Sequence, residues 1–168
     1  MLVGRDTELA VLDSLVAQTA AGAGGIVLLT GEPGVGKTRL ARVGTERAAE
    51  AAVSWGACRE SEGAPPLWPW LQVIRHLGGP EVAVSAAEGA VARYRLYERI
   101  EHTLAAQAQD KPQLIVIDDL HRADEASLRL LAYLSETLWP APIGLVVAYR
   151  DTEVPPASLT ANVVAGLA

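Results

Sequence analysis

The sequence has one cysteine, no long apolar run, and no cluster of His and Cys with the spacing of a metal site. A membrane-spanning helix needs about 20 consecutive apolar residues, so we expect no contact with a membrane. One cysteine excludes an internal disulfide and suits a reducing compartment, which predicts a cytoplasmic protein. Cys58 itself is expected to be a small buried hydrophobic side chain rather than a reactive thiol.

The sequence also lacks a visible secretory signal, and it has fewer basic than acidic residues. The opening residues, MLVGRD, lack a basic region followed by an apolar stretch. Fourteen Lys and Arg against 20 Asp and Glu give a formal net charge of −6 and a pI of about 5.0. Nucleic-acid surfaces are basic, so we expect no direct nucleic-acid binding by this segment. A chain of 168 residues corresponds to one domain.

The most informative segment is 31–38, which reads GEPGVGKT. It matches G-x-x-x-x-G-K-[S/T], the phosphate-binding loop of P-loop nucleotidases, at every defined position. An apolar run of strand length, 26–30, precedes the motif, and 39–52, rich in Ala, Glu and Arg, predicts a helix after it. A glycine-rich turn without a ligand is the alternative, but it would not require Lys and Thr at these positions. The segment is therefore interpreted as a nucleotide site.

The residue types of this loop suit a polyphosphate. Three glycines permit backbone conformations that let N–H groups turn toward the phosphates, at the positive end of the following helix. Lys37 supplies a mobile charge for the β- and γ-phosphates, and Thr38 offers a hydroxyl to Mg²⁺. The nucleotide-binding residues predicted here are Gly31, Pro33, Gly34, Val35, Gly36, Lys37, Thr38 and Arg39.

The run LIVIDD at 114–119 is the second chemical element. Four aliphatic residues in a row predict a strand buried on both faces, as in the centre of a parallel sheet. Two acids follow at its carboxyl end, where open α/β sheets bind their ligands, and this is the Walker B pattern. Asp118 is expected to hold Mg²⁺, through a water, and Asp119 to orient or deprotonate the attacking water. A pair of acids in a surface turn is the alternative, which the P-loop in the same chain disfavours.

Arg150 follows another apolar strand, 143–149. A guanidinium there would face the γ-phosphate and report its presence, so we group it with Lys37 and Asp119 as the catalytic set. The alternative is a surface ion pair with Asp151 or Glu153.

The segment before the P-loop strand also has two interpretations. A helix over 7–21, with Asp6 as its N-cap, is predicted by apolar residues at helical spacing. A helix in that position often reaches the base of the nucleotide, which would place Val3, Gly4 and Arg5 beside it. An exposed charge at Arg5 is the equally weighted alternative.

The remaining elements complete an α/β pattern. Strands are predicted at 26–30, 53–58, 114–118 and 143–149, and further helices at 69–77, 91–109 and 124–138, with a short one after Pro155 and Pro156. Tyr94, Tyr97, Ile100 and Leu104 are expected along one side of the 91–109 helix. Trp68 and Trp70 are expected to pack an insertion against the sheet rather than to form a partner surface. His121 is interpreted as a solvated or structural histidine in preference to a phosphate or metal sensor.

Several stretches together resemble one family: VGR with EL at 3–9, the loop 31–38, LIVIDDLHRAD at 114–124 and AYRDTE at 148–153. They are similar to the AAA+-related, signal-transduction (STAND) ATPase domain at the N-terminus of large LuxR-type bacterial transcriptional regulators. The resemblance implies a P-loop NTPase three-layer sandwich with a parallel sheet of order 5-1-4-3-2. It implies ATP or ADP with Mg²⁺ as ligands, Arg150 as the sensor arginine and residues 3–5 beside the base.

The same resemblance implies a nucleotide-operated switch with slow hydrolysis. Nothing after Arg150 has the length of a fifth strand and a helical lid, so we expect 1–168 to be a truncated core that lacks its lid, regulatory and DNA-binding domains. Arg122 stands where many relatives have Trp, and Asp119 stands where mechanical AAA+ motors have Glu, one methylene longer, which argues against fast turnover. A nucleotide-binding interaction module with negligible hydrolysis, and a P-loop kinase for a small molecule, are the alternative functions.

Overall fold

The structure is a computed structural model of the chain, and it describes residues 4–59, 64–78, 89–138 and 140–168. Its strands are β1 (Gly25–Leu29), β2 (Ala52–Ala57), β3 (Gln113–Asp118) and β4 (Ile143–Ala148). Its α-helices are α1 (Asp6–Ala20), α2 (Lys37–Glu46), α3 (Trp68–His76), α4 (Ala90–Asp110), α5 (Glu125–Thr137) and α6 (Leu159–Leu167). Two 3₁₀ turns, η1 (Leu120–Arg122) and η2 (Asp151–Glu153), follow β3 and β4.

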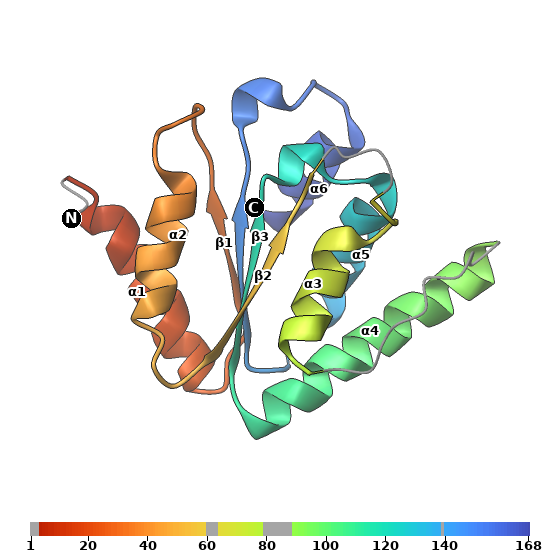
Figure 1. Ribbon diagram of the computed structural model, residues 1–168, viewed down its shortest axis with the longest axis horizontal. Helices are drawn as coiled ribbons and strands as arrows, with labels where there is room; N and C mark the ends of the chain where they lie inside the picture. The colour runs from red at the N-terminus through yellow and green to blue at the C-terminus, as the bar shows by residue number, and fades with distance from the viewer. Residues whose placement is uncertain (1–3, 60–63, 79–88, 139) are drawn as a thin grey trace.

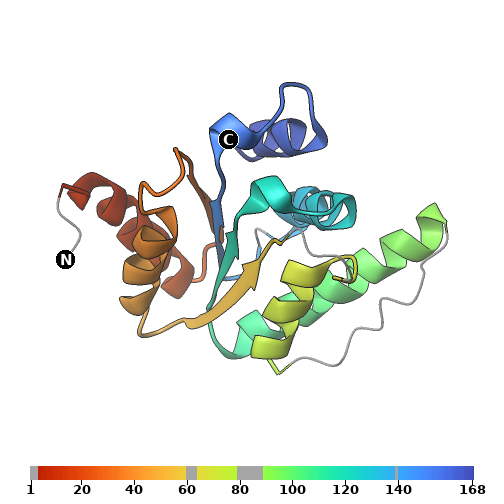
Figure 2. The ribbon, with the colours of Figure 1, turned by 45° about the horizontal axis from the view of Figure 1, so that its top comes forward.

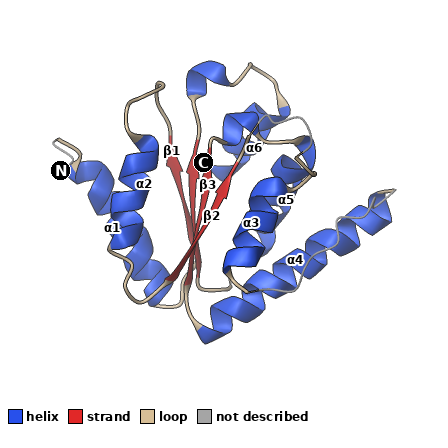
Figure 3. Cartoon of the chain, in the orientation of Figure 1, coloured by secondary structure: helices blue, strands red, loops and turns tan. Residues whose placement is uncertain are grey.

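The four strands form one parallel sheet in the order β1-β4-β3-β2. Figure 3 shows the strands running the same way, so that their carboxyl ends meet at one edge of the sheet. The order agrees with the 1-4-3-2 part of the expected sheet, and the α/β P-loop NTPase class is confirmed. Within the described residues β1 pairs with β4 and with no other strand. No strand lies within 151–168, which holds η2 and α6.

Helices cover both faces of the sheet, which makes three layers (Figure 1). Helices α1 and α2 pack on one face, against Leu114 and Val116 of β3. The other face, which carries Ile115 and Ile117, packs against α3, α4 and α5. All four of these β3 side chains are at most 1% exposed. The prediction of a central strand buried on both faces is therefore confirmed, as alternating side chains fill two separate cores.

The tryptophan-containing insertion packs as predicted for Trp70. This side chain is 1% exposed, and its indole Nε1 donates to the Ser127 carbonyl of α5 at 3.2 Å. Helix α3 lies directly on β2, where an added Cβ at Gly56 would stand 2.3 Å from the Pro69 carbonyl oxygen. A glycine is required at this strand position because the helix backbone approaches so closely.

Three local predictions were wrong. The helix expected over 39–52 ends at Glu46, because Ala48 and Ala51 are buried in a turn and Ala52 already donates to the Pro112 carbonyl beside β3. Here tertiary packing overrides the helix propensity of alanine. Asp6 is the first residue of α1 rather than its N-cap, and Arg5 occupies the cap position without a side-chain bond.

The third error concerns α4. Tyr97, Ile100 and Leu104 are buried as expected, but Tyr94 is 54% exposed. Figures 1 and 2 show why: the first turns of α4 project away from the sheet layers. Tyr94 instead meets Tyr133 of α5 edge to face, with ring centroids 5.4 Å apart. No helix within the described residues has both the length and the apolarity to span a membrane.

Candidate nucleotide site

The P-loop connects the end of β1 to the start of α2 at the carboxyl edge of the sheet (Figure 1). Gly31, Gly34 and Gly36 have φ values of 143°, 78° and 96°, a region that side chains other than glycine rarely adopt. Gly36 precedes the first helical residue, Lys37, and no side chain caps the N-terminus of α2. Its first N–H groups are therefore available to an anion, in the field of the helix dipole.

The Lys37 ammonium group lies over this loop. Its Nζ donates to the Gly31 carbonyl at 2.7 Å and to the Glu32 carbonyl at 2.9 Å. Both acceptors are neutral backbone groups, whereas phosphate oxygens carry full charge and make stronger bonds to an ammonium group. The lysine is thus held beside the loop by contacts that a phosphate can replace.

Thr38 and Asp118 connect the two predicted motifs directly. The Thr38 hydroxyl donates to Asp118 Oδ2 at 2.8 Å, and Asp118 Oδ1 accepts from the Asp119 N–H at 3.0 Å. One hydroxyl and one carboxylate on a site open to solvent are the oxygen ligands that Mg²⁺ binds beside phosphates. The residues present therefore fit Mg²⁺, although no cluster of three or more His, Cys, Asp or Glu with metal-site geometry occurs in the described residues.

Asp119 begins the turn that follows β3. Its φ is 55°, in the left-handed region, which Asp tolerates better than most residues. The conformation turns the chain into η1, and the Arg122 N–H donates to the Asp119 carbonyl at 2.9 Å. Its side chain is 37% exposed, so the carboxylate is accessible to a water molecule near the phosphate site.

Arg5 lies on the other side of the P-loop. Its Nη1 donates to Glu8 Oε1 at 2.6 Å, and its Nη2 to the Val35 carbonyl at 3.3 Å. The bond from Arg5 lowers the pKa of the Glu8 carboxyl. Gly4 is exposed, and Val3 lies outside the described residues.

These contacts border a pocket of about 250 Å³. Arg5 lines it from the position before α1 and Glu8 from within α1. Leu28 and Thr30 come from β1 and the residue after it, and Val35 and Lys37 from the P-loop segment. The structure therefore places Arg5 and the P-loop beside the same cavity. The alternative interpretation of Arg5, an exposed charge, does not predict this arrangement. Pro33 and Arg39 are exposed on the loop and on the first turn of α2.

Arg150 is held by Glu153 at the end of β4. Its Nη1 lies 2.5 Å from Glu153 Oε1, an ion pair of two partly exposed side chains. That bond raises the pKa of Arg150 and lowers the pKa of Glu153. The surface pair weighed against the sensor role is thus present, and the field of Asp118 and Asp119 also acts on Arg150.

His121 connects this pair to the Walker B turn. Its Nε2 lies 3.3 Å from Glu153 Oε2 and 3.9 Å from Asp119 Oδ1, and its side chain is 2% exposed. Neither ring nitrogen makes a hydrogen bond to the described part of the chain. Burial lowers the pKa of His121 against the opposing effect of the two carboxylates. A solvated histidine was one of the two alternatives expected here, and the burial of the ring contradicts it.

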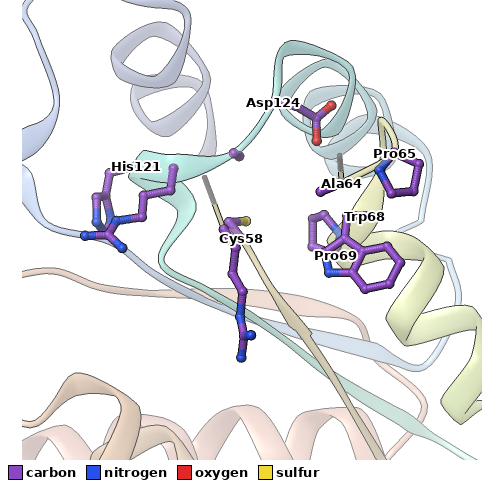
Figure 4. A pocket seen from close by; sticks show the side chains of 10 residues that line it. Cys58, Ala64, Pro65, Trp68, Pro69, His121 and Asp124 are labelled. Atoms are coloured by element: carbon purple, nitrogen blue, oxygen red, sulfur yellow. The ribbon is translucent and has the colours of Figure 1, made fainter. Parts of the chain in front are cut away.

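His121 also borders a second pocket, of about 290 Å³, shown in Figure 4. Trp68, Pro65 and Pro69 line its opposite wall, and Cys58 its floor. Cys58 is 2% exposed, as predicted, and burial raises the pKa of its thiol. Asp124 is already engaged as the N-cap of α5, through Ser127 N–H and hydroxyl donors.

Sequence reasoning missed the contact of Glu8 with Arg5, and it named Glu153 only as one alternative partner of Arg150. Each glutamate lies three residues beyond an arginine already singled out, and this spacing is the available signal for an ion pair on a helix or turn. The approach of Glu153 to His121 has no such signal, because it depends on β3 and β4 being neighbours in the sheet.

The family of this chain follows from its sequence match. Residues 1–147 match the AAA ATPase domain family. The chain belongs to this family. No curated protein of known function matches the sequence of this AAA ATPase domain.

Solved structures show the same fold. Cdc6p from Pyrobaculum aerophilum aligns with a TM-score of 0.65 and 20% identity, covering 96% of this chain and 43% of that protein. The ORC1 protein of Aeropyrum pernix, solved in complex with DNA, aligns with a TM-score of 0.60 and 21% identity, covering 97% of this chain and 44% of that protein. Drosophila ORC bound to DNA aligns with a TM-score of 0.60 and 18% identity, covering 89% of this chain and 38% of that protein. The AAA ATPase domain described here thus spans less than half the length of each of these proteins.

Proposed function

We propose that this domain binds ATP with Mg²⁺ and hydrolyses it slowly, as a switch that regulates a larger signalling or transcription-regulatory protein. The observation that carries the proposal is the bond between the Thr38 hydroxyl and Asp118 Oδ2 at 2.8 Å. It brings the two oxygen ligands for Mg²⁺ together at the N-terminus of α2, beside Lys37. Bound Mg²⁺ would supply charge neutralisation between the phosphate oxygens.

Each part of the nucleotide has a candidate partner in the described residues. The P-loop N–H groups and Lys37 would bind the phosphates, and Thr38 and Asp118 the metal ion. The pocket beside Arg5 would take the base and sugar, and Arg150 would contact the γ-phosphate once it leaves Glu153. Adenine is proposed as the base because of the resemblance to STAND ATPases.

Slow hydrolysis is supported by the position of Asp119. Its side chain is one methylene shorter than the Glu of mechanical AAA+ motors, which places the carboxylate farther from an attacking water molecule. A switch needs its ATP state to last, so slow turnover suits the proposed role. The alternative, an interaction module with negligible hydrolysis, would use the same nucleotide site with a turnover rate close to zero.

Calorimetric titration with ATP and ADP, with and without Mg²⁺, tests the proposal. We expect micromolar binding of both nucleotides, and tighter binding of ATP when Mg²⁺ is present. An affinity for ATP that Mg²⁺ does not change would contradict the role given to Thr38 and Asp118. No binding by this segment or by a longer protein carrying its lid would contradict the nucleotide function altogether.

The pocket beside Trp68 favours a second candidate function, a kinase for a small molecule. It opens next to the Walker B turn, where an acceptor would have to meet the γ-phosphate. Measuring ADP and inorganic phosphate together distinguishes the two reactions. Equal amounts indicate hydrolysis, whereas ADP in excess of phosphate in the presence of an acceptor indicates phosphoryl transfer.

We also propose that residues 1–168 are the core of a larger domain, in which a fifth strand pairs with the open edge of β1 and a lid covers the nucleotide. The side of β1 away from β4 has no strand partner in the described residues, which supports this. Nucleotide binding should tighten when residues beyond 168 are added.

The net charge of −6 supports the further proposal that this segment does not itself bind nucleic acid. Fluorescence anisotropy with duplex DNA at low salt would test this proposal.

A further inference from the structure

Glu153 occupies a position between the proposed sensor arginine and the Walker B turn. One of its carboxylate oxygens contacts Arg150 Nη1 and the other lies 3.3 Å from His121 Nε2. Arg150 comes from the end of β4, whereas His121 belongs to η1 after β3. A single side chain therefore touches both loops that border the γ-phosphate position.

The contact with Arg150 is of a kind that a phosphate can displace. Arg150 and Glu153 side chains are 24% and 38% exposed, and exposed ion pairs contribute little because water and salt screen them. A γ-phosphate offers an arginine two charged oxygens in a geometry that matches the guanidinium fork. Glu153 and the γ-phosphate would thus compete for one guanidinium, at a cost small enough for the phosphate to prevail.

The contact with His121 provides the other half of the arrangement. The imidazole is 2% exposed, and its two nitrogens make no hydrogen bond to the residues that the structure describes. A buried polar group without a partner is costly, so the ring gains from any acceptor that becomes available. Glu153 Oε2, at 3.3 Å, is the nearest carboxylate oxygen, and once Arg150 leaves, the Glu153 side chain would be free to turn toward the ring.

We propose that Glu153 is a latch that holds Arg150 away from the nucleotide until a γ-phosphate arrives, and then accepts a hydrogen bond from His121. The latch makes the domain discriminate ATP from ADP, since ADP has no γ-phosphate with which to compete for Arg150. This inference rests on the proposed function and assigns to it a positioning residue outside the P-loop and Walker B motifs.

Glu153→Gln tests the latch, because the amide keeps the shape and removes the charge that holds Arg150. We expect ATP·Mg²⁺ affinity to rise by about two- to fivefold, the range that one exposed ion pair allows, with ADP affinity unchanged. In an Arg150→Ala background the same substitution should have no effect on either nucleotide. Glu125→Gln is the matched control, because it removes an i,i+4 arginine pair of 2.8 Å on the exposed side of α5.

A second readout follows His121 itself. Replacing the exposed His76 and His102 with Asn leaves His121 as the only histidine, so its ring ¹⁵N signals can be read directly by NMR. We expect the Nε2 signal to move when adenylyl imidodiphosphate with Mg²⁺ is added, and not when ADP is added. The movement should disappear in the Glu153→Gln protein.

The outcomes separate the latch from the function on which it rests. Equal changes in ATP and ADP affinity, an effect that persists without Arg150, or identical His121 signals with both nucleotides would overturn the latch while nucleotide binding stands. Failure of the unsubstituted protein to bind either nucleotide, alone or with its lid, would overturn the proposed function and the latch with it.

Discussion

The Thr38 hydroxyl donates to Asp118 Oδ2 at 2.8 Å across 80 residues of sequence. Thr38 lies in the first turn of α2, whereas Asp118 is the last residue of β3. Their contact forms only when β1 and β3 stand on either side of β4 with their carboxyl ends level, as the register of the sheet requires. The contact between Thr38 and Asp118 is therefore a product of the sheet order.

Lys37→Ala should remove detectable ATP and ADP binding while the domain stays folded. Each charge-assisted hydrogen bond to a phosphate contributes about 1.5–3 kcal/mol, and Lys37 can make more than one. Among the described residues its Nζ donates to two loop carbonyls, so the core does not depend on it. Calorimetry measures binding and circular dichroism the fold. Lys111→Ala, at the exposed end of α4, is the control, and unchanged ATP affinity in Lys37→Ala would refute the P-loop assignment.

Asp119→Asn should slow hydrolysis by about 10²-fold or more and leave ATP affinity nearly unchanged, because an amide cannot act as a general base. Turnover is measured as inorganic phosphate released per minute. Asp151→Asn, in the exposed turn η2, serves as the control substitution. If the unsubstituted protein shows no turnover above background and Asp119→Asn does not change it, the interaction module becomes the better description.

Gly56→Ala should destabilise the domain by at least about 1–3 kcal/mol, the usual cost of overpacking. Its Cβ would stand 2.3 Å from the Pro69 carbonyl oxygen, which would have to move with α3. Gly166→Ala is the control, since no heavy atom lies within 4 Å of its Cβ and alanine favours the helix α6. Urea unfolding of both proteins gives the comparison, and equal midpoints would contradict the close packing of α3 on β2.

Burial of His121 should make stability fall as the solution becomes more acidic. Its pKa is lowered in the folded state, from an ordinary value of about 6.5, so below that pH the unfolded chain binds a proton that the folded one refuses. The stabilisation is complete above pH 6.5 and is lost as pH falls through the folded-state pKa, by up to about 1.4 kcal/mol per pH unit.

Urea unfolding between pH 7.5 and 5.5 measures this dependence above the range of the carboxylates. The slope should flatten in His121→Gln and persist in His76→Asn, which changes an exposed histidine of α3. If the stability of His121→Gln depended on pH as steeply as that of the unsubstituted protein, this explanation of the pH dependence would be contradicted.

Much of the fold could be predicted because its signals are local. The runs LIVID and IGLVVA predict their strands to within one residue, since a parallel strand buried on both faces typically carries such adjacent aliphatic side chains. The P-loop motif could be identified because its glycines, Lys37 and Thr38 all lie within eight residues. The order of the strands came from the family resemblance, as sequence periodicity does not specify which strands are neighbours.

The wrong predictions concern features that depend on packing between segments far apart in the sequence. The helix α2 ends at Glu46 because Ala52 joins the strand that pairs with β3. The alanines themselves favour a helix, so the local sequence does not predict this end. Tyr94 belongs by spacing to the buried side of α4, but the sheet does not extend far enough to cover it. Glu153 was visible only as one possible partner of Arg150, and its second neighbour, His121, comes from another loop.

The position of β4 also constrains how the chain acquires its structure during synthesis. Strand β1 is made early, but its only strand neighbour among the described residues is β4, paired from Gly25 with Gly144 to Leu29 with Ala148. Hairpin-like pairing of successive segments cannot supply this contact, and such long-range pairings close slowly. The P-loop is therefore synthesised well before its neighbouring strand β4, and until then β1 has none of the described strands with which to pair.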